Sequence, residues 1–265
     1  MATSVQFPDL LRLIDERAVA LRAAVSSAAS LEMPVPTCPE WTLLELVQHL
    51  GNSHRRWAAT VAAGPADTAP DEAVWRSSPA PPSDREALLG WSQESTTQLL
   101  SALRAAGRDR SCWTWWGAAQ SPSTSGAVAR HQLQHIAVHT YDAQITVGNP
   151  QPLPDEAALD GVEEFLFTCC SGTDPWPHEP CAVIYEATEG RSWRLSLSAD
   201  GARTAPIPAP GTVVSTTTDD AAASLRGTAS DLVLVMYGRI PASSLQGKGD
   251  VHIFDQLLAW DPDAQ

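Results

Sequence analysis

Three histidines stand four residues apart in the segment 130–143 (RHQLQHIAVHTYDA), and an aspartate follows the last of them. They are His131, His135 and His139, and Asp142 lies three residues after His139. The segment contains no Gly or Pro, so we expect a helix, in which residues three or four apart share one face. His135, His139 and Asp142 would then project side by side. Neutral imidazoles one helical turn apart can both bind one metal ion, as in many zinc sites.

The same stripe has two simpler interpretations, a solvent-facing polar face or core histidines that pair with Asp142. A histidine pair alone is a moderate signal, because a zinc site requires further ligands. His49 is the candidate third ligand, since it lies among apolar residues two turns into another expected helix. With His135 and His139 it would supply three nitrogens and leave one coordination position open, as in catalytic zinc sites. The alternative role for His49 is that of a satisfied core histidine.

Four amphipathic helical patterns in the first half of the chain would position these residues. Apolar residues at a period near 3.6 extend over about residues 8–29, and a proline-rich break follows. Capping boxes of the form T/S-x-x-E open a second helix at Thr42 and a third at Ser83. The histidine stripe lies in a fourth helix, over about residues 125–148. These capped helices predict a four-helix bundle over residues 1–150.

Strand signals appear in the second half of the chain. Two segments are rich in strand-forming residues, the second with clean alternation, and Asp200-Gly201 is a turn signal. The expected elements are strands over 181–186, 192–198 and 213–217, and helices over 155–166, 219–227, 230–238 and 250–260. Residues 151–265 are therefore expected to form a smaller α+β domain, which makes the fold class of the whole chain α+β.

Composition restricts the class of partner. The 265 residues include 31 Asp and Glu against 17 Lys and Arg, and the net charge of −14 argues against nucleic acid and anionic membranes. No basic stretch leads into an N-terminal apolar run, and no run approaches about 18 apolar residues, so neither a signal peptide nor a membrane span is expected. A single Lys among the basic residues is typical of a GC-rich bacterial genome.

The five cysteines lack CxxC spacing, so neither a disulfide framework nor a Cys-rich zinc site is expected. We expect a cytoplasmic protein with reduced thiols. Since none of the cysteines is expected beside the histidine stripe, we assign them structural roles. His54 adjoins two arginines, Arg55 and Arg56, and is expected at the surface.

Four segments, in order, resemble one protein family. They are 35–50 (VPTCPEWTLLELVQHL), 134–143 (QHIAVHTYDA), 152–166 (PLPDEAALDGVEEFL) and 225–239 (LRGTASDLVLVMYGR). In these segments the chain resembles the mycothiol-dependent maleylpyruvate isomerase-like proteins of actinobacteria, over nearly its whole length. The resemblance implies a DinB-like four-helix bundle with a zinc site, followed by a smaller α+β domain related to sterol carrier proteins.

The resemblance places the family's metal ligands on His49, His135 and His139. The middle ligand is usually a glutamate in the family, so His135 makes the site three neutral nitrogens, as in other DinB-like thiol transferases. Losing one anionic ligand raises the net charge of the site and the Lewis acidity of the metal. The arginine after the last family histidine is Thr140 here. These departures leave the identity of the substrate open, because membership is a weaker guide to substrate than to fold.

We therefore expect a zinc-dependent thiol transferase or isomerase. The metal would activate mycothiol or another low-molecular-weight thiol for addition to a small, anionic electrophile. Asp142 is the candidate partner that fixes an imidazole tautomer, and Arg239 the candidate contact for an anionic group. A helix-surface aspartate and a helix C-terminal charge are their alternative roles. Two other functions stay open: a metal-dependent small-molecule hydrolase, and a non-enzymatic protein that binds a metal or small ligand.

Overall fold

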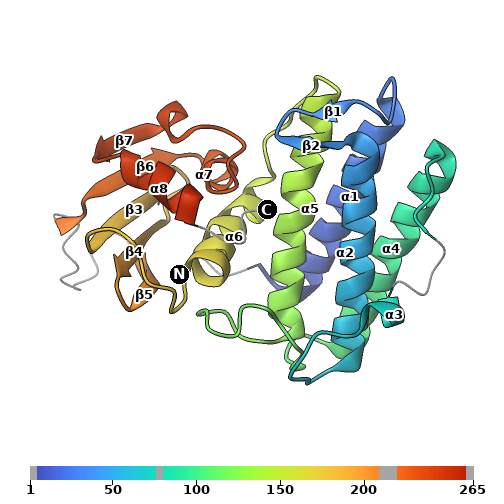
Figure 1. The fold of residues 1–265 in the computed structure, drawn as a ribbon, viewed down its shortest axis with the longest axis horizontal. Helices are drawn as coiled ribbons and strands as arrows, with labels where there is room; N and C mark the ends of the chain where they lie inside the picture. The colour runs from blue at the N-terminus through green and yellow to red at the C-terminus, as the bar shows by residue number, and fades with distance from the viewer. Residues whose placement is uncertain (1–4, 76–79, 209–219, 261–265) are drawn as a thin grey trace. The chain divides into compact units, whose positions relative to one another are not determined.

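The computed structural model describes residues 5–75, 80–208 and 220–260. The chain divides into two compact units. One contains the residues up to Trp115 together with Ser123–Leu153, and the other contains Trp116–Pro122 together with the residues from Pro154 onward. Helices dominate the first unit and a sheet with helices forms the second (Figure 1), so the α+β class predicted from the sequence is confirmed. That each unit folds independently as a domain stays a prediction.

The first unit is built on four long helices that run beside one another (Figure 1). Helices α1, α2 and α4 each bury an apolar face, as their periodicity predicts. Helix α5 is instead buried on most sides, and its buried residues include polar ones. In the described part of the chain, no helix combines the length and apolar character needed to cross a membrane. The elements of this unit are α1 (Phe7–Ser27), β1 (Pro34–Val35), β2 (Cys38–Thr42), α2 (Leu43–Ala63), α3 (Glu72–Trp75), α4 (Arg85–Ala106) and α5 (Ser125–Thr146).

Side-chain caps begin α2 and α4 near the predicted residues. The Thr42 hydroxyl accepts a hydrogen bond from the backbone N–H of Glu45 at 3.3 Å, and the Glu45 carboxylate accepts one from the backbone N–H of Thr42 at 2.8 Å. The capping box predicted for α2 is therefore confirmed. The box predicted at Ser83 is wrong, because Asp84 is the cap of α4 and accepts from the N–H of Ala87.

The proline-rich break between α1 and α2 folds into a small antiparallel hairpin of β1 and β2, which the sequence analysis did not predict. Val35 is fully buried and anchors the hairpin to the bundle. The backbone N–H of Leu43 donates to the Met33 carbonyl at 2.9 Å, so the hairpin is also tied to the first turn of α2.

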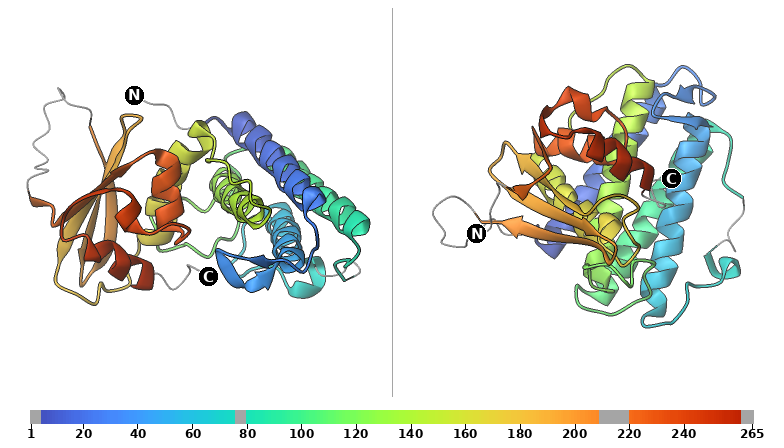
Figure 2. Two further views of the ribbon diagram at one scale, coloured as in Figure 1. Left: turned by 90° about the horizontal axis from the view of Figure 1, so that it is seen from above. Right: turned by 60° about the vertical axis from the view of Figure 1, so that its left-hand side comes forward.

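The second unit contains a five-stranded sheet in the order β5-β4-β3-β6-β7. β3 and β6 pair in parallel, and the other pairs are antiparallel. Helices α6, α7 and α8 lie on one face of this sheet (Figure 2). The elements are α6 (Asp155–Phe165), a π-helical turn (Leu166–Cys170), β3 (Cys181–Ala187), β4 (Ser192–Ser198), β5 (Gly201–Ile207), β6 (Ala223–Gly227), α7 (Ala229–Met236), a 3-10 turn (Ala242–Ser244), β7 (Gln246–Gly249) and α8 (His252–Trp260).

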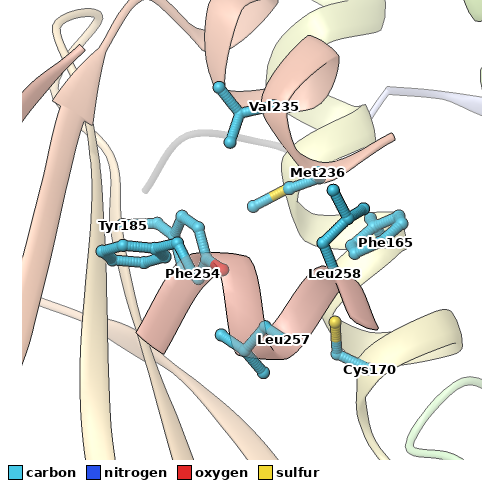
Figure 3. A pocket seen from close by; sticks show the side chains of 8 residues that line it. All are labelled: Phe165, Cys170, Tyr185, Val235, Met236, Phe254, Leu257 and Leu258. Atoms are coloured by element: carbon cyan, nitrogen blue, oxygen red, sulfur yellow. The ribbon is translucent and has the colours of Figure 1, made fainter. Parts of the chain in front are cut away.

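Apolar side chains fill the space between this sheet and its helices (Figure 3). The rings of Tyr185 on β3 and Phe254 on α8 are 5.3 Å apart between centroids. The cavity among these side chains has a volume of only about 20 Å³, which is room for a single water molecule. Burial raises the pKa of Tyr185 well above its usual value. This region is the core of the second unit.

Several predictions in the second half are wrong. The helix expected over 219–227 is replaced by β6, which pairs with β3 in the register Val183↔Ala223. Two strands, β5 and β7, were not predicted. The residues of β6 are Ala-Ser-Leu-Arg-Gly, which carry little strand preference of their own, so the partner strand determines their conformation. The strand expected over 213–217 lies outside the described residues.

Candidate metal centre

Three imidazoles from two helices meet inside the first unit. His49 comes from α2, while His135 and His139 lie one turn apart on α5. The Nε2 atoms of His49 and His135 are 2.9 Å apart. The ring centroid of His139 lies 5.4 Å from that of His49 and 4.8 Å from that of His135. One nitrogen from each histidine lies within 4.8 Å of the other two, so the structure brings together the three histidines selected from the sequence.

The donor set fits a zinc ion. Zinc binds imidazole nitrogens at about 2.0–2.1 Å, so nitrogens around a tetrahedral ion lie about 3.3 Å apart. The 2.9 Å between the two Nε2 atoms of His49 and His135 is within a few tenths of an ångström of that requirement. His139 directs Nδ1 at Asp142, 2.8 Å away, which leaves its Nε2 as the atom for a metal.

Burial keeps the imidazoles in the form that binds metals. The pKa of His49 is lowered to about 3, chiefly by burial and also by the positive charges that His139 and His54 would carry. Burial also lowers the pKa of His135 well below its usual value, again with a contribution from His139. At neutral pH His49 and His135 are therefore uncharged and offer a lone pair, as metal binding requires.

Asp142 lies behind His139 and is fully buried, with 0 % of its surface exposed. Its Oδ2 accepts from His139 Nδ1 at 2.8 Å, and its Oδ1 accepts from the Thr37 hydroxyl at 2.6 Å. The alternative of a helix-surface aspartate is excluded by this burial. The carboxylate is placed to hold the proton of His139 on Nδ1. Its role at a metal centre stays a prediction.

Two residues of the hairpin border the histidines, and sequence reasoning did not select them. The ring centroid of Trp41 lies 4.5 Å from that of His49 and 5.7 Å from that of His139. The Cys38 thiol donates to Asp142 Oδ2 at 3.6 Å, so the expectation that no cysteine lies beside the stripe is wrong. Both residues belong to the segment VPTCPEWT, whose resemblance to the family was the only available signal, since about a hundred residues separate it from α5.

The surface position expected for His54 is also wrong, because its side chain is only 2 % exposed. Its Nδ1 lies 3.2 Å from the Thr96 hydroxyl of α4. The next residue, Arg55, is buried too and donates from Nε to the Ser95 hydroxyl at 2.8 Å. This part of α2 packs against α4. Burial, together with the smaller effect of the Arg22 charge, lowers the pKa of His54 to about 4.

Two further residues named from the sequence, His131 and Arg239, are not members of the three-histidine group. The ring of His131 stacks parallel to that of His135 at a centroid distance of 6.5 Å, and it packs edge-on against Trp115. Arg239 follows α7 in the second unit and donates from Nη1 to the Tyr237 carbonyl at 2.7 Å. Its contact with an anionic substrate stays a prediction.

Comparison with family models identifies both halves of the chain. The Mycothiol maleylpyruvate isomerase N-terminal domain matches residues 11–144, and the MDMPI C-terminal domain matches residues 156–256. Crystal structures of the mycothiol-dependent maleylpyruvate isomerase and of a mutant of it share the fold, with TM-scores of 0.60 and 0.61 and sequence identities of 13% and 12%. Each alignment covers 94% of this chain and 97% of the other. No curated protein matches the sequence.

Proposed function

The chain belongs to the mycothiol maleylpyruvate isomerase family, and on that premise we propose that it is a zinc-dependent thiol transferase or isomerase. Its thiol is mycothiol or a similar low-molecular-weight thiol, and its substrate is a small electrophile that carries an anionic group. The observation that carries this proposal is the convergence of three imidazoles on one point, two of them held neutral by burial.

In this proposal His49, His135 and His139 hold the zinc ion. A zinc ion bound there supplies a Lewis acid that lowers the pKa of a thiol and so yields a thiolate near neutral pH. Asp142 holds the His139 proton on Nδ1. Trp41 packs its ring against His49 and His139 and shields that side of the centre from water.

The chemistry of a thiolate accounts for both activities. Its sulfur adds to one end of a conjugated double bond, and the π electrons move toward the conjugated carbonyl group. The former double bond can then rotate. When the enolate electrons return and expel the thiolate, the double bond forms again in the other geometry, which is isomerisation. When the enolate carbon instead takes a proton from water and the sulfur stays bound, the product is a conjugate, which is transfer. An arginine suits the anionic group of such a substrate, and Arg239 is our proposed contact.

A turnover assay with and without thiol tests the proposal. Purified protein is incubated with maleylpyruvate or another conjugated carboxylic acid in three parallel reactions, which contain mycothiol, cysteine or no thiol. The loss of the starting isomer is measured in each reaction. We expect turnover only with added thiol, loss of turnover with a chelator and recovery with zinc. Full turnover without thiol would indicate the hydrolase instead. Stoichiometric zinc binding without turnover of any of these compounds would indicate a binding protein.

A further inference from the structure

The hairpin before α2 supplies the hydrogen bonds that a buried carboxylate requires. A buried charge is costly unless hydrogen bonds compensate it, and Asp142 is fully buried. The Thr37 hydroxyl donates to Oδ1 at 2.6 Å, a short charge-assisted bond, and the Cys38 thiol donates to Oδ2 at 3.6 Å. The hairpin and α5 therefore meet at this carboxylate, although 105 residues separate Thr37 from Asp142.

The position of Asp142 determines which nitrogen of His139 carries the proton. A neutral imidazole has one N–H and one lone pair, and the partner of one nitrogen decides the state of the other. Because Asp142 accepts from Nδ1 at 2.8 Å, Nε2 keeps its lone pair. Thr37 thus acts on His139 through Asp142, at the end of a chain of two hydrogen bonds.

The same hairpin also restrains the histidine on the other helix. The ring of Trp41 lies against that of His49, with centroids 4.5 Å apart and planes tilted by 38°. The next residue, Thr42, caps α2 together with Glu45, two turns before His49. Four residues within the segment 37–42 therefore contact or orient the proposed ligands on both helices: Thr37, Cys38, Trp41 and Thr42.

We propose that residues 37–42 are the positioning element of the metal centre and that Thr37 is its principal positioning residue. Removal of the Thr37 hydroxyl then weakens metal binding although Thr37 does not itself contact the metal. The inference rests on the proposed function, since it takes the three histidines as the ligands. Cys38 serves as a second, weaker donor to the same carboxylate.

Zinc affinity of Thr37 variants, measured by competition with a chromophoric chelator, tests the inference. Thr37→Val keeps the shape of the side chain and removes the donor, and we expect zinc affinity to fall about 10- to 100-fold. Thr37→Ser restores the hydroxyl and should bind nearly as tightly as wild type. The matched control is Thr146→Val, because the Thr146 hydroxyl donates to the backbone carbonyl of Asp142 and not to its carboxylate. Unchanged affinity in folded Thr37→Val would overturn the inference.

A second readout needs no metal. In the metal-free protein at neutral pH, nitrogen NMR should show His139 protonated at Nδ1. In Thr37→Val, a fraction of the molecules should carry that proton on Nε2 instead. Cys38→Ala should lower the zinc affinity and raise the Nε2-protonated fraction of His139, each by a smaller amount than Thr37→Val. This variant tests the inference if Thr37→Val does not fold. Wild-type protein that binds no zinc would refute the proposed function, and the NMR measurement alone would then decide the inference. An unchanged His139 tautomer would count against it.

Discussion

The Nε2 atoms of His49 and His135 face each other from α2 and α5 at a distance of 2.9 Å. Two lone pairs at that distance repel, so the pair requires either a proton between them or a shared cation. Burial lowers the pKa of both imidazoles, so at neutral pH the metal-free pair is uncharged, and one ring donates its Nε2–H to the lone pair of the other. A zinc ion bound here, as we propose, would replace that hydrogen bond and take the lone pairs of both nitrogens, with His139 as the third ligand.

The first prediction concerns zinc content. Purified protein should hold about one zinc ion per chain, as a site with three ligands and one open position does. His139→Ala and His49→Ala should each lose most of the metal, because two nitrogens bind zinc poorly. His131→Ala is the control and should keep its zinc, since the His131 ring packs against Trp115 outside the three-histidine group. Elemental analysis decides this, and equal zinc in all four proteins would refute the site.

The second prediction concerns the identity of the middle ligand. His135→Glu should keep zinc, because a carboxylate binds zinc at about the same distance as an imidazole. The added negative charge reduces the positive charge at the centre, so the thiol should ionise at a pH higher by about one unit. The pH–rate profile of the thiol-dependent reaction measures this as a shift of its acidic limb. His135→Ala is the matched control and should lose zinc. An unshifted limb in a zinc-loaded His135→Glu protein would contradict the prediction.

Local patterns in the sequence account for the parts of the site that were predicted. The capping box at Thr42 and Glu45 depends on residues three apart, and so does the contact between His139 and Asp142. Such spacings fix which side chains share a helix face before any tertiary structure is known. His49 could be added because it lies on an apolar face of another expected helix.

The parts that were missed depend on contacts between distant residues. Thr37 and Cys38 reach Asp142 across more than a hundred residues, and no periodicity in the hairpin marks that contact. The burial of His54 was missed because two adjoining arginines suggested solvent, whereas Arg55 is paired inside the bundle. β6 was missed because its pairing with β3 overrides a weak local preference.

The third prediction concerns the pH dependence of stability. Burial lowers the pKa of His54 to about 4 in the folded protein, against about 6.5 in the unfolded chain. Between these values the unfolded state binds a proton that the folded state does not. The free energy of unfolding therefore falls as pH falls from about 6.5 to 4, by up to about 1.4 kcal/mol per pH unit for this residue. His49 and His135 act in the same direction.

Urea denaturation of the metal-free protein at a series of pH values measures this effect. His54→Gln should reduce the slope of stability against pH in that window, since glutamine does not titrate. A His54→Gln protein with the wild-type slope would show that His54 is not held neutral by burial.

The last prediction concerns the packing of α2 against α4, which supports the helix that carries His49. A Cβ added at Gly51 would lie 2.0 Å from a ring carbon of Trp91, far inside van der Waals contact. Trp91 is itself buried, and the guanidinium carbon of Arg55 lies over its ring, 5.2 Å from the ring centroid. The ring therefore has little room to move. Gly51→Ala should therefore lower the free energy of unfolding by about 1–3 kcal/mol.

Gly90→Ala provides the matched control, because Gly90 lies on the exposed side of α4 and an added Cβ there meets no atom within 4 Å. Alanine favours a helix over glycine by up to about 1 kcal/mol, so this substitution should stabilise the protein. The same change of residue is thus expected to have opposite effects on two facing helices. Denaturant unfolding of both variants measures the difference, and a Gly51→Ala protein as stable as Gly90→Ala would show that the Trp91 ring does not pack on the backbone of α2.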